Sequence, residues 1–271
     1  MQNIGSMESK GWEFEVGGDI IRTKDFTWSS SMNLSHNTGK ILTLEGDNSY
    51  HNGNGFVAPG TPGDAARMEA GSTIGSFYMW KFAGFDDEGS FLLYNKDGEV
   101  IPAAQKTEND KQYIGNYTPK LIIGWSHTLT YKNFDLGINL RSWIDFDVYN
   151  TINMYYGIQG QGNLNVLKDA YGKFNHIKGE KQICDYFLED GTFLKIDAIT
   201  LGYTLPMKMY TNNLIDRIRI YGTVGNVCTI TGYSGMNPEV DITGWDKGTE
   251  KFWSDFYPVV RTWTLGMQFN F

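Results

Sequence analysis

The sequence lacks a long apolar run, although the chain has 271 residues. Hydrophobic residues make up 41% of it, and the mean hydropathy is −0.37. No stretch reaches the ~18 consecutive apolar residues that a membrane-spanning helix needs, which excludes a helical membrane protein. A transmembrane β-barrel stays open, because only every second residue of its strands faces lipid.

Cysteine and positive charge are also scarce. The two cysteines are Cys184 and Cys228, and we expect two unpaired thiols rather than a disulfide. The formal net charge is −8. Because the phosphate backbone attracts basic proteins, this charge argues against a nucleic-acid partner.

Patterns typical of catalysis and of cofactor or metal binding are missing as well. The acidic residues at 86–88 and 189–190 come without a nucleophile or base pattern, so we expect them to be solvated loop residues. No glycine-rich loop leads from a strand into a helix. The four histidines show no ligand spacing: His36, His51, His127 and His176. We therefore expect no enzyme activity, no cofactor and no metal site.

What the sequence does contain is alternation, most clearly at its C-terminal end. Every second position there is apolar, namely Trp263, Leu265, Met267, Phe269 and Phe271. Successive side chains of a strand point to opposite faces, so this stretch has one apolar and one polar face. A soluble sandwich and a transmembrane barrel both produce that pattern. The length is close to the ~9–11 residues that cross a bilayer at a tilt, which favours the barrel.

Further stretches alternate in the same way, at residues 11–21, 25–37, 120–132, 134–144, 192–205 and 216–228. Within one of them the apolar phase shifts near Ala198, which predicts a β-bulge. Stretches joined by short links indicate hairpins. We predict an all-β fold: an antiparallel meander of about seven long strands.

The connections alternate between short and long. Short links lie at 22–24, 132–133 and 206–214, and long ones at 38–119, 145–191 and 229–260. Transmembrane barrels have short periplasmic turns at one end and longer outer loops at the other. The pattern therefore favours part of a large transmembrane β-barrel with long outer loops. A soluble all-β carbohydrate- or protein-binding domain is the alternative.

Within the long connections, residues 76–85 indicate a strand or a folded loop element, and residues 165–174 a short helix. Several aromatic residues of these connections are candidates for ligand or partner contacts, with ordinary loop packing as the alternative. They are Tyr78, Trp80, Tyr155, Tyr156, Trp245 and Trp253.

In a barrel, alternate strand residues face lipid. We expect a membrane-facing set of Trp28, Leu34, Ile123, Leu136, Ile138, Ile220, Leu265 and Met267. We expect an inward-facing set of Ser31, Asn33, Gly124, Asn139, Arg141, Arg219 and Gln268. Phe271 is expected to face outward at the periplasmic membrane edge, as an assembly signal.

Several motifs, in the same order along the chain, resemble one family. They are KGWEFEVG at 10–17, GSFYMWKFAGF at 75–85, DYFLEDGTFLKIDAITLGYTLP at 185–206, GNVCTITGYSGMNPEV at 225–240 and YPVVRTWTLGMQFNF at 257–271. These segments resemble the barrel portion of SusC/RagA-type TonB-dependent outer-membrane transporters of the Bacteroidetes.

The resemblance implies that residues 1–271 are a C-terminal barrel segment, with no plug domain present. It further implies location in the cell outer membrane, contact with outer-membrane lipid, and import of a glycan or peptide ligand with a SusD-like surface lipoprotein. The TonB complex would act through a missing N-terminal part. The first residues lack the pattern of a signal peptide, which such a protein needs, so we expect a fragment.

Overall fold

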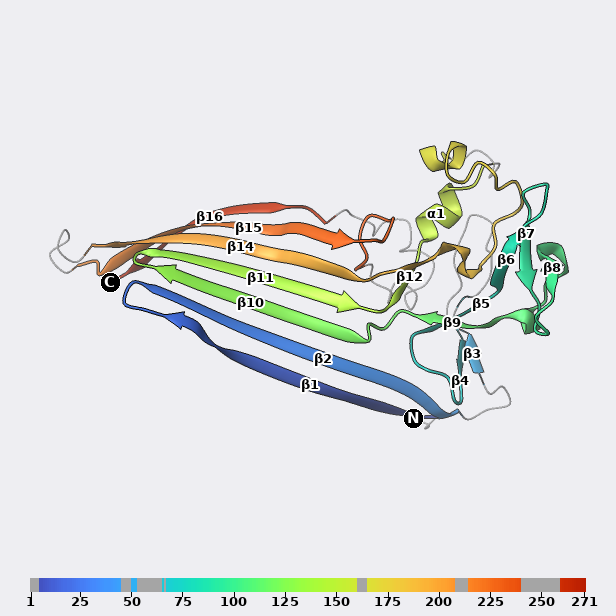
Figure 1. The fold of residues 1–271 in the computed structure, drawn as a ribbon, viewed down its shortest axis with the longest axis horizontal. Coiled ribbons are helices and arrows are strands. Elements are labelled where there is room, and N and C mark those ends of the chain that lie inside the picture. The colour runs from blue at the N-terminus through green and yellow to red at the C-terminus, as the bar shows by residue number, and fades with distance from the viewer. Residues whose placement is uncertain are drawn as a thin grey trace.

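A seven-stranded antiparallel sheet dominates the computed structural model, which describes residues 5–44, 50–52, 65, 67–159, 165–207, 214–239 and 259–271 (Figure 1). Its strands are β1 (Gly5–Arg22), β2 (Phe26–Leu44), β10 (Leu121–Tyr131), β11 (Phe134–Ile144), β14 (Phe193–Pro206), β15 (Arg217–Thr231) and β16 (Thr262–Asn270). They lie side by side in chain order. The predicted fold class is confirmed.

The first two strands are longer than alternation predicts. Pairing continues to Gly5 opposite Leu44, well beyond residues 11–37. The side-chain pattern fades there, at Thr38 and Gly39, but backbone hydrogen bonds do not depend on side chains. The predicted bulge near Ala198 is confirmed: Asp197 is left out of the pairing on both sides of β14.

Cross-strand pairing fixes which residues share a face of the sheet. Trp28 lies opposite Leu129, which lies opposite Leu136, and that residue lies opposite Leu201. Carried across the sheet, the register puts all eight residues expected to face the membrane on one face, here called the apolar face. The seven residues expected to face inward lie on the opposite, polar face. That lipid covers the apolar face stays a prediction.

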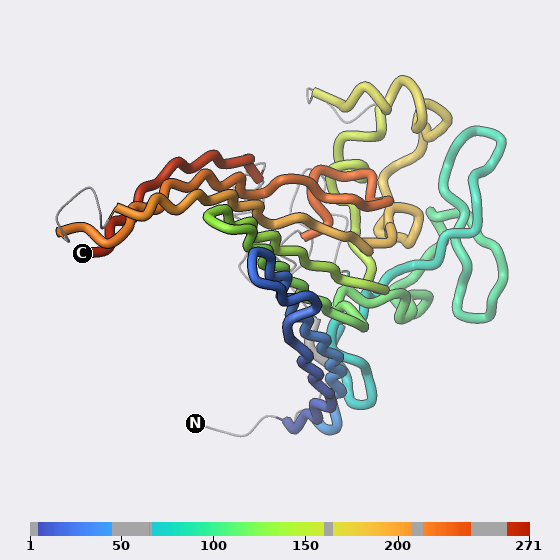
Figure 2. Tube along the Cα trace, turned by 60° about the vertical axis from the view of Figure 1, so that its left-hand side comes forward, coloured from blue at the N-terminus to red at the C-terminus, as the bar shows by residue number. Residues whose placement is uncertain are grey.

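The turns that join β1 to β2 and β10 to β11 lie at one end of the sheet, beside the facing ends of β14 and β15, and the described parts of the long segments lie at the other end (Figures 1 and 2). The long segments form β3 (Tyr50–Asn52), β4 (Arg67–Glu69), β5 (Ser76–Met79), β6 (Lys81–Phe85), β7 (Phe91–Tyr94), β8 (Val100–Pro102), β9 (Gln112–Asn116), β12 (Asp147–Tyr149), β13 (Leu188–Asp190) and α1 (Thr151–Tyr156). Single turns of 3-10 helix lie at Ala103–Gln105, Glu108–Asp110, Lys168–Tyr171 and Asp185–Phe187. The helix expected at 165–174 is thus one such turn.

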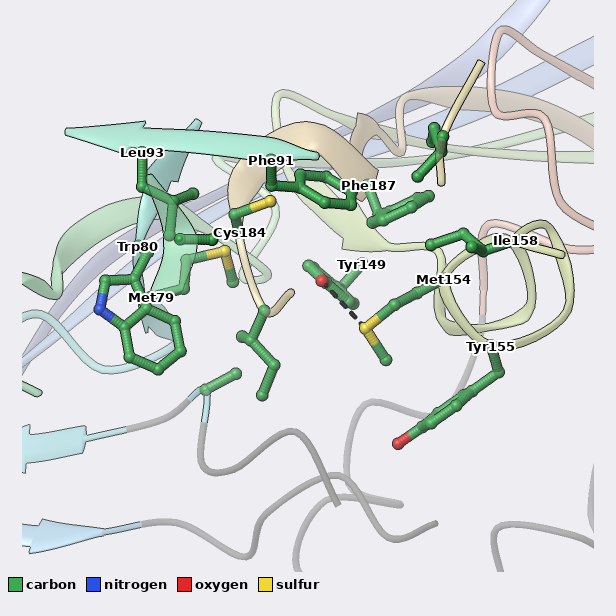
Figure 3. Packing of buried hydrophobic residues seen from close by; sticks show 14 of the residues in the cluster. Met79, Trp80, Phe91, Leu93, Tyr149, Met154, Tyr155, Ile158, Cys184 and Phe187 are labelled. Atoms are coloured by element: carbon green, nitrogen blue, oxygen red, sulfur yellow. Dashed lines mark hydrogen bonds between the residues drawn. The ribbon is translucent and has the colours of Figure 1, made fainter. Parts of the chain in front are cut away.

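The larger hydrophobic cluster of the described residues lies in these long segments rather than in the sheet. Residues 67–119, 145–159 and 165–190 pack together in what we call the outer lobe. Its buried cluster includes Phe77, Met79, Phe91, Leu93, Met154, Ile158, Ile177, Ile183 and Phe187 (Figure 3). The Tyr149 hydroxyl donates to the sulfur of Met154 inside it, at 3.3 Å. Two connections far apart in sequence therefore fold as one body.

The helices of the described residues are all too short and too polar to span a membrane. The strands of the sheet, in contrast, expose large apolar side chains on the apolar face. Leu265 is 82% exposed and Trp263 77%. A sheet with this much exposed apolar surface needs a covering, since patches of this kind mark interaction or membrane surfaces.

Candidate functional site

Two half-buried carboxylates tie the outer lobe together. Asp147, at the start of β12, accepts a hydrogen bond from the backbone N–H of Asn116, 2.8 Å away at the end of β9. Asp185 accepts from the backbone N–H of Phe82 at 2.6 Å. Burial raises the pKa of both carboxyl groups. Each contact joins the segment 67–119 to the segment 145–190.

Glu189 joins the second long connection to the third. Its carboxylate accepts from the Ser234 N–H at 2.7 Å, from the Ser234 hydroxyl at 2.8 Å and from the Asn150 amide at 2.9 Å. Asn150 is 1% exposed and also caps α1 by accepting from the N–H of Asn153. Glu189 was expected to be a solvated acid, which is wrong: the Ser234 turn folds over it. Its neighbour Asp190 is exposed as expected.

Four charged side chains, here called the charged quartet, meet on the polar face where β14 bulges. They are Arg141, Lys195, Asp197 and Glu239. Glu239 pairs with Lys195 at 2.5 Å and with Arg141 at 2.7 Å, and Arg141 also reaches Asp197 at 3.1 Å. Bulges re-aim side chains, and here the extra residue supplies the second carboxylate. Lys195 and Glu239 are nearly buried, so the quartet fixes the third connection to the sheet.

Strand β15 has an irregularity of its own, facing the bulge of β14. Asn226 adopts a φ of 52°, and its amide donates to the carbonyl of Val259 at 3.1 Å. The Arg261 guanidinium donates to the carbonyl of Val227 at 2.6 Å. Both described ends of the third connection are therefore bound to the bulged part of the sheet.

The aromatic residues predicted as contacts fall into three groups. Trp80 and Tyr155 are each 3% exposed and belong to the core. The Trp80 indole donates to the carbonyl of Thr107 at 2.8 Å, and Lys111 lies over its ring. Tyr78 and Tyr156 are half-buried. Trp245 and Trp253 lie outside the described residues.

Tyr78 is part of a polar-aromatic patch at the surface of the lobe. Its ring lies 5.1 Å from that of Tyr113, and its hydroxyl accepts from Arg67 at 2.8 Å. Arg67 in turn pairs with Glu69 at 3.1 Å. Burial raises the pKa of Tyr113 to about 12. Two partly open rings beside a cation and an anion can contact a sugar ring or a peptide, and the sequence reasoning missed Tyr113 because β9 pairs with β5 only in the fold.

The polar face carries a second ion pair near the short turns. Arg219 on β15 reaches both carboxylate oxygens of Asp135 on β11, at 2.9 and 2.5 Å. Gly202 lies between them on β14, and an added Cβ there would approach Asp135 and Arg219 to 2.5 and 2.6 Å. The bidentate pair therefore depends on the missing side chain of that glycine.

Aromatic side chains line the apolar face near the short turns. Phe26, Tyr131, Phe134 and Tyr203 follow one another across four strands. Such rows occur where a membrane meets water, because amphipathic rings prefer that level. Farther along the face, the Trp28 indole donates to Nδ1 of His127 at 3.3 Å.

Two remaining expectations concern the strand end and metals. Phe271 follows β16 and is 87% exposed; its assembly role stays a prediction. Among the residues that the structure describes, no group of three or more His, Cys, Asp or Glu side chains could hold a metal ion.

Comparisons with known proteins agree with this geometry. No family model matches the chain. The chain is 27% identical to "TonB-dependent receptor P3" of Formosa agariphila and 29% identical to "TonB-dependent receptor SusC" of Bacteroides thetaiotaomicron, with all of this chain covered in both cases. A solved structure titled "Structure of the RagAB peptide transporter" matches with a TM-score of 0.75 and 25% identity, over 99% of this chain.

The sheet, its loops and these matches define a class, the outer-membrane β-barrels. Within it, the chain resembles SusC/RagA-type TonB-dependent transporters over its whole length, as its motifs predict, and its location is the cell outer membrane. The chain spans 29% and 27% of the length of the two curated relatives and 30% of the solved chain.

Proposed function

We propose that this chain is the C-terminal barrel segment, residues 1–271, of a TonB-dependent importer. In this proposal the seven strands form part of the barrel wall, with the apolar face against lipid and the polar face toward the lumen. The outer lobe lies above the wall, outside the cell. Two observations carry the proposal. All of this chain matches part of TonB-dependent receptors, and the sheet has one apolar face with short connections at one end and long ones at the other.

The proposed cargo is an oligosaccharide or a peptide, captured with a SusD-like surface lipoprotein. One similar structure is titled as a peptide transporter, which supports a peptide cargo, and the oligosaccharide follows from the resemblance of the motifs. Within the described residues, the patch of Arg67, Glu69, Tyr78 and Tyr113 is the proposed ligand contact. Energy would come from the TonB complex through the N-terminal part of the transporter.

The chain's own residues would bind and position the cargo, without making or breaking covalent bonds. Paired aromatic rings give stacking area at little conformational cost, and Arg67 and Glu69 offer directed hydrogen bonds. The soluble-domain alternative is disfavoured, since it gives no reason for the exposed apolar side chains of β16.

A growth experiment tests the proposal. The gene that encodes this segment is deleted, and the bacterium is grown on defined oligosaccharides and on defined peptides as sole carbon source. We expect loss of growth on one cargo class, restored by the intact gene. The tagged transporter should also co-purify with a surface lipoprotein. Unchanged growth on every cargo, with no lipoprotein recovered, would refute the importer proposal.

A further inference from the structure

We propose that the loop end of β1 and β2 holds a binding site for the phosphate groups of an outer-leaflet glycolipid. The site comprises Lys10, Trp12, His36 and Lys40 on the apolar face. It rests on the proposed function, because it requires lipid against that face.

The register places the four residues together. Trp12 lies opposite His36, and their rings are 5.9 Å apart. Lys10 is opposite Thr38, and Lys40 is opposite Glu8, on the same face of the same strand pair. The next residues toward the turns, Phe14 and Leu34, are apolar. The basic group therefore borders the apolar face directly.

The level of the site matches the outer edge of a membrane. Along β2, the residues from Phe26 in the aromatic row to His36 span about 33 Å at ~3.3 Å per residue. At a strand tilt of ~40° this becomes about 25 Å along the membrane normal, which equals the usual height of the apolar band of such barrels. Trp12 and His36 thus lie at the outer interface, and Lys10 and Lys40 lie two and four residue pairs above it, where headgroups are.

The charges fit an anion that spans more than one lysine. Lys10 pairs with Glu8 at 2.8 Å, with both side chains open to solvent, and Lys40 is also exposed. Two lysines flank one carboxylate, so a positive charge is left over. Exposed ion pairs are weak, so phosphate can displace Glu8 from Lys10. Basic residues at this level attract anionic headgroups.

His36 adds a directional contact. Its Nδ1 faces the carbonyl of Lys120 at 2.5 Å, and a carbonyl can only accept, so Nδ1 carries the proton. This contact holds the imidazole ring beside Trp12. Trp12 offers its indole at the same level, as expected for an interfacial tryptophan.

The test uses the full-length transporter in detergent, with diphosphorylated lipid A as the probe and native mass spectrometry as the readout. Replacing Lys10 or Lys40 with Gln should lower retention of the lipid about fivefold each, following the usual effect of one basic residue at a membrane surface. Glu8→Gln should raise retention, and Lys10→Arg should preserve it. Lys24→Gln, in the turn at the opposite end, is the matched control and should change nothing.

Retention by the Lys10→Gln and Lys40→Gln variants that equals that of the unaltered protein would overturn the site. So would retention of dephosphorylated lipid A or of phosphatidylglycerol that equals that of diphosphorylated lipid A. A spin label at Leu265 separates this inference from the proposed function. If the label is reached by dissolved oxygen but not by a water-soluble nickel chelate, the face contacts lipid even when the site fails. If the chelate reaches it, the lipid-facing proposal itself is wrong.

Discussion

At the residue scale, Ile138 tests which face of the sheet meets lipid. It lies near the middle of β11 on the apolar face, and its neighbour Asn139 lies on the polar face. Ile138→Arg in the full-length protein should lower the free energy of unfolding by about 2–4 kcal/mol in lipid vesicles. Asn139→Arg should cost less than about 1 kcal/mol, because it would point into a wet lumen. Similar losses for both variants would contradict the assignment.

The glycine between Arg219 and Asp135 is a second residue-scale test. Gly202→Ala places a Cβ against both partners, so it should disrupt the bidentate pair and cost about 1–2 kcal/mol in thermal or urea unfolding. Asp135→Asn should cost a similar amount, and the double variant should lose little more than either single one. Gly137→Ala is the control, because its Cβ would meet nothing closer than 4.0 Å. Additive losses would show that Gly202 acts on something else.

At the element scale, Glu189 should control the turn at Ser234. Glu189→Ala removes the acceptor for the Ser234 N–H and hydroxyl and for Asn150. Hydrogen bonds to a charged acceptor are worth about 1.5–3 kcal/mol, so amide hydrogen exchange should quicken at Ser234 and at the start of α1. Glu88→Gln, in an exposed hairpin turn, should leave exchange at both sites unchanged. Unaltered exchange in the Glu189→Ala variant would show that Glu189 does not hold the turn at Ser234.

The contact between β9 and β12 should depend on pH. Burial raises the pKa of Asp147 in the folded state, so the protonated form is favoured there relative to the unfolded chain. Its contribution to stability is therefore full below the pKa of the unfolded state and is lost as pH rises through the folded pKa. Asp147→Asn should flatten the rise of exchange at Asn116 between acidic and neutral pH. An unchanged profile in this variant would assign the pH dependence to other groups.

The strands of the large sheet could be predicted from the sequence. Alternation predicts the strands, because each strand of the sheet has one apolar and one polar face and the period of two survives without tertiary information. It predicts the bulge at Asp197 for the same reason. Alternation does not predict the extension of β2 to Leu44, because backbone pairing with β1 leaves no signal in the side chains.

The structure of the outer lobe could not be predicted from the alternation of apolar and polar residues. Its core joins residues from two distant connections, and a short aromatic run looks the same whether it faces a core or a ligand. Trp80 and Tyr155 were singled out for possible contacts, and the fold buries both. Glu189 lay inside a recognised motif, but only the position of Ser234 shows that it is a structural acceptor.

At the scale of the whole molecule, the open sheet predicts poor behaviour of the 271-residue chain in isolation. Among the residues that the structure describes, β1 and β16 each pair with one strand, so their outer edges are unpaired there, and the apolar face is exposed. Unpaired edges template aggregation and apolar patches add to it. Expression of this segment alone should give inclusion bodies and no monomer in buffer without detergent. A monodisperse monomer that melts cooperatively, observed by sedimentation and circular dichroism, would favour the soluble alternative.

The joined loops of the outer lobe also bear on how such a protein can change its cargo. Asp147, Asp185, Glu189 and Glu239 each connect a segment to something outside its own loop. A loop transplanted singly from a relative would arrive without its acceptors and would leave unpaired donors behind in the recipient. Recombination or engineering of new uptake specificity should therefore succeed by exchange of the whole lobe together with the third connection and its anchors at Arg141 and Lys195. Exchange of single loops should fail.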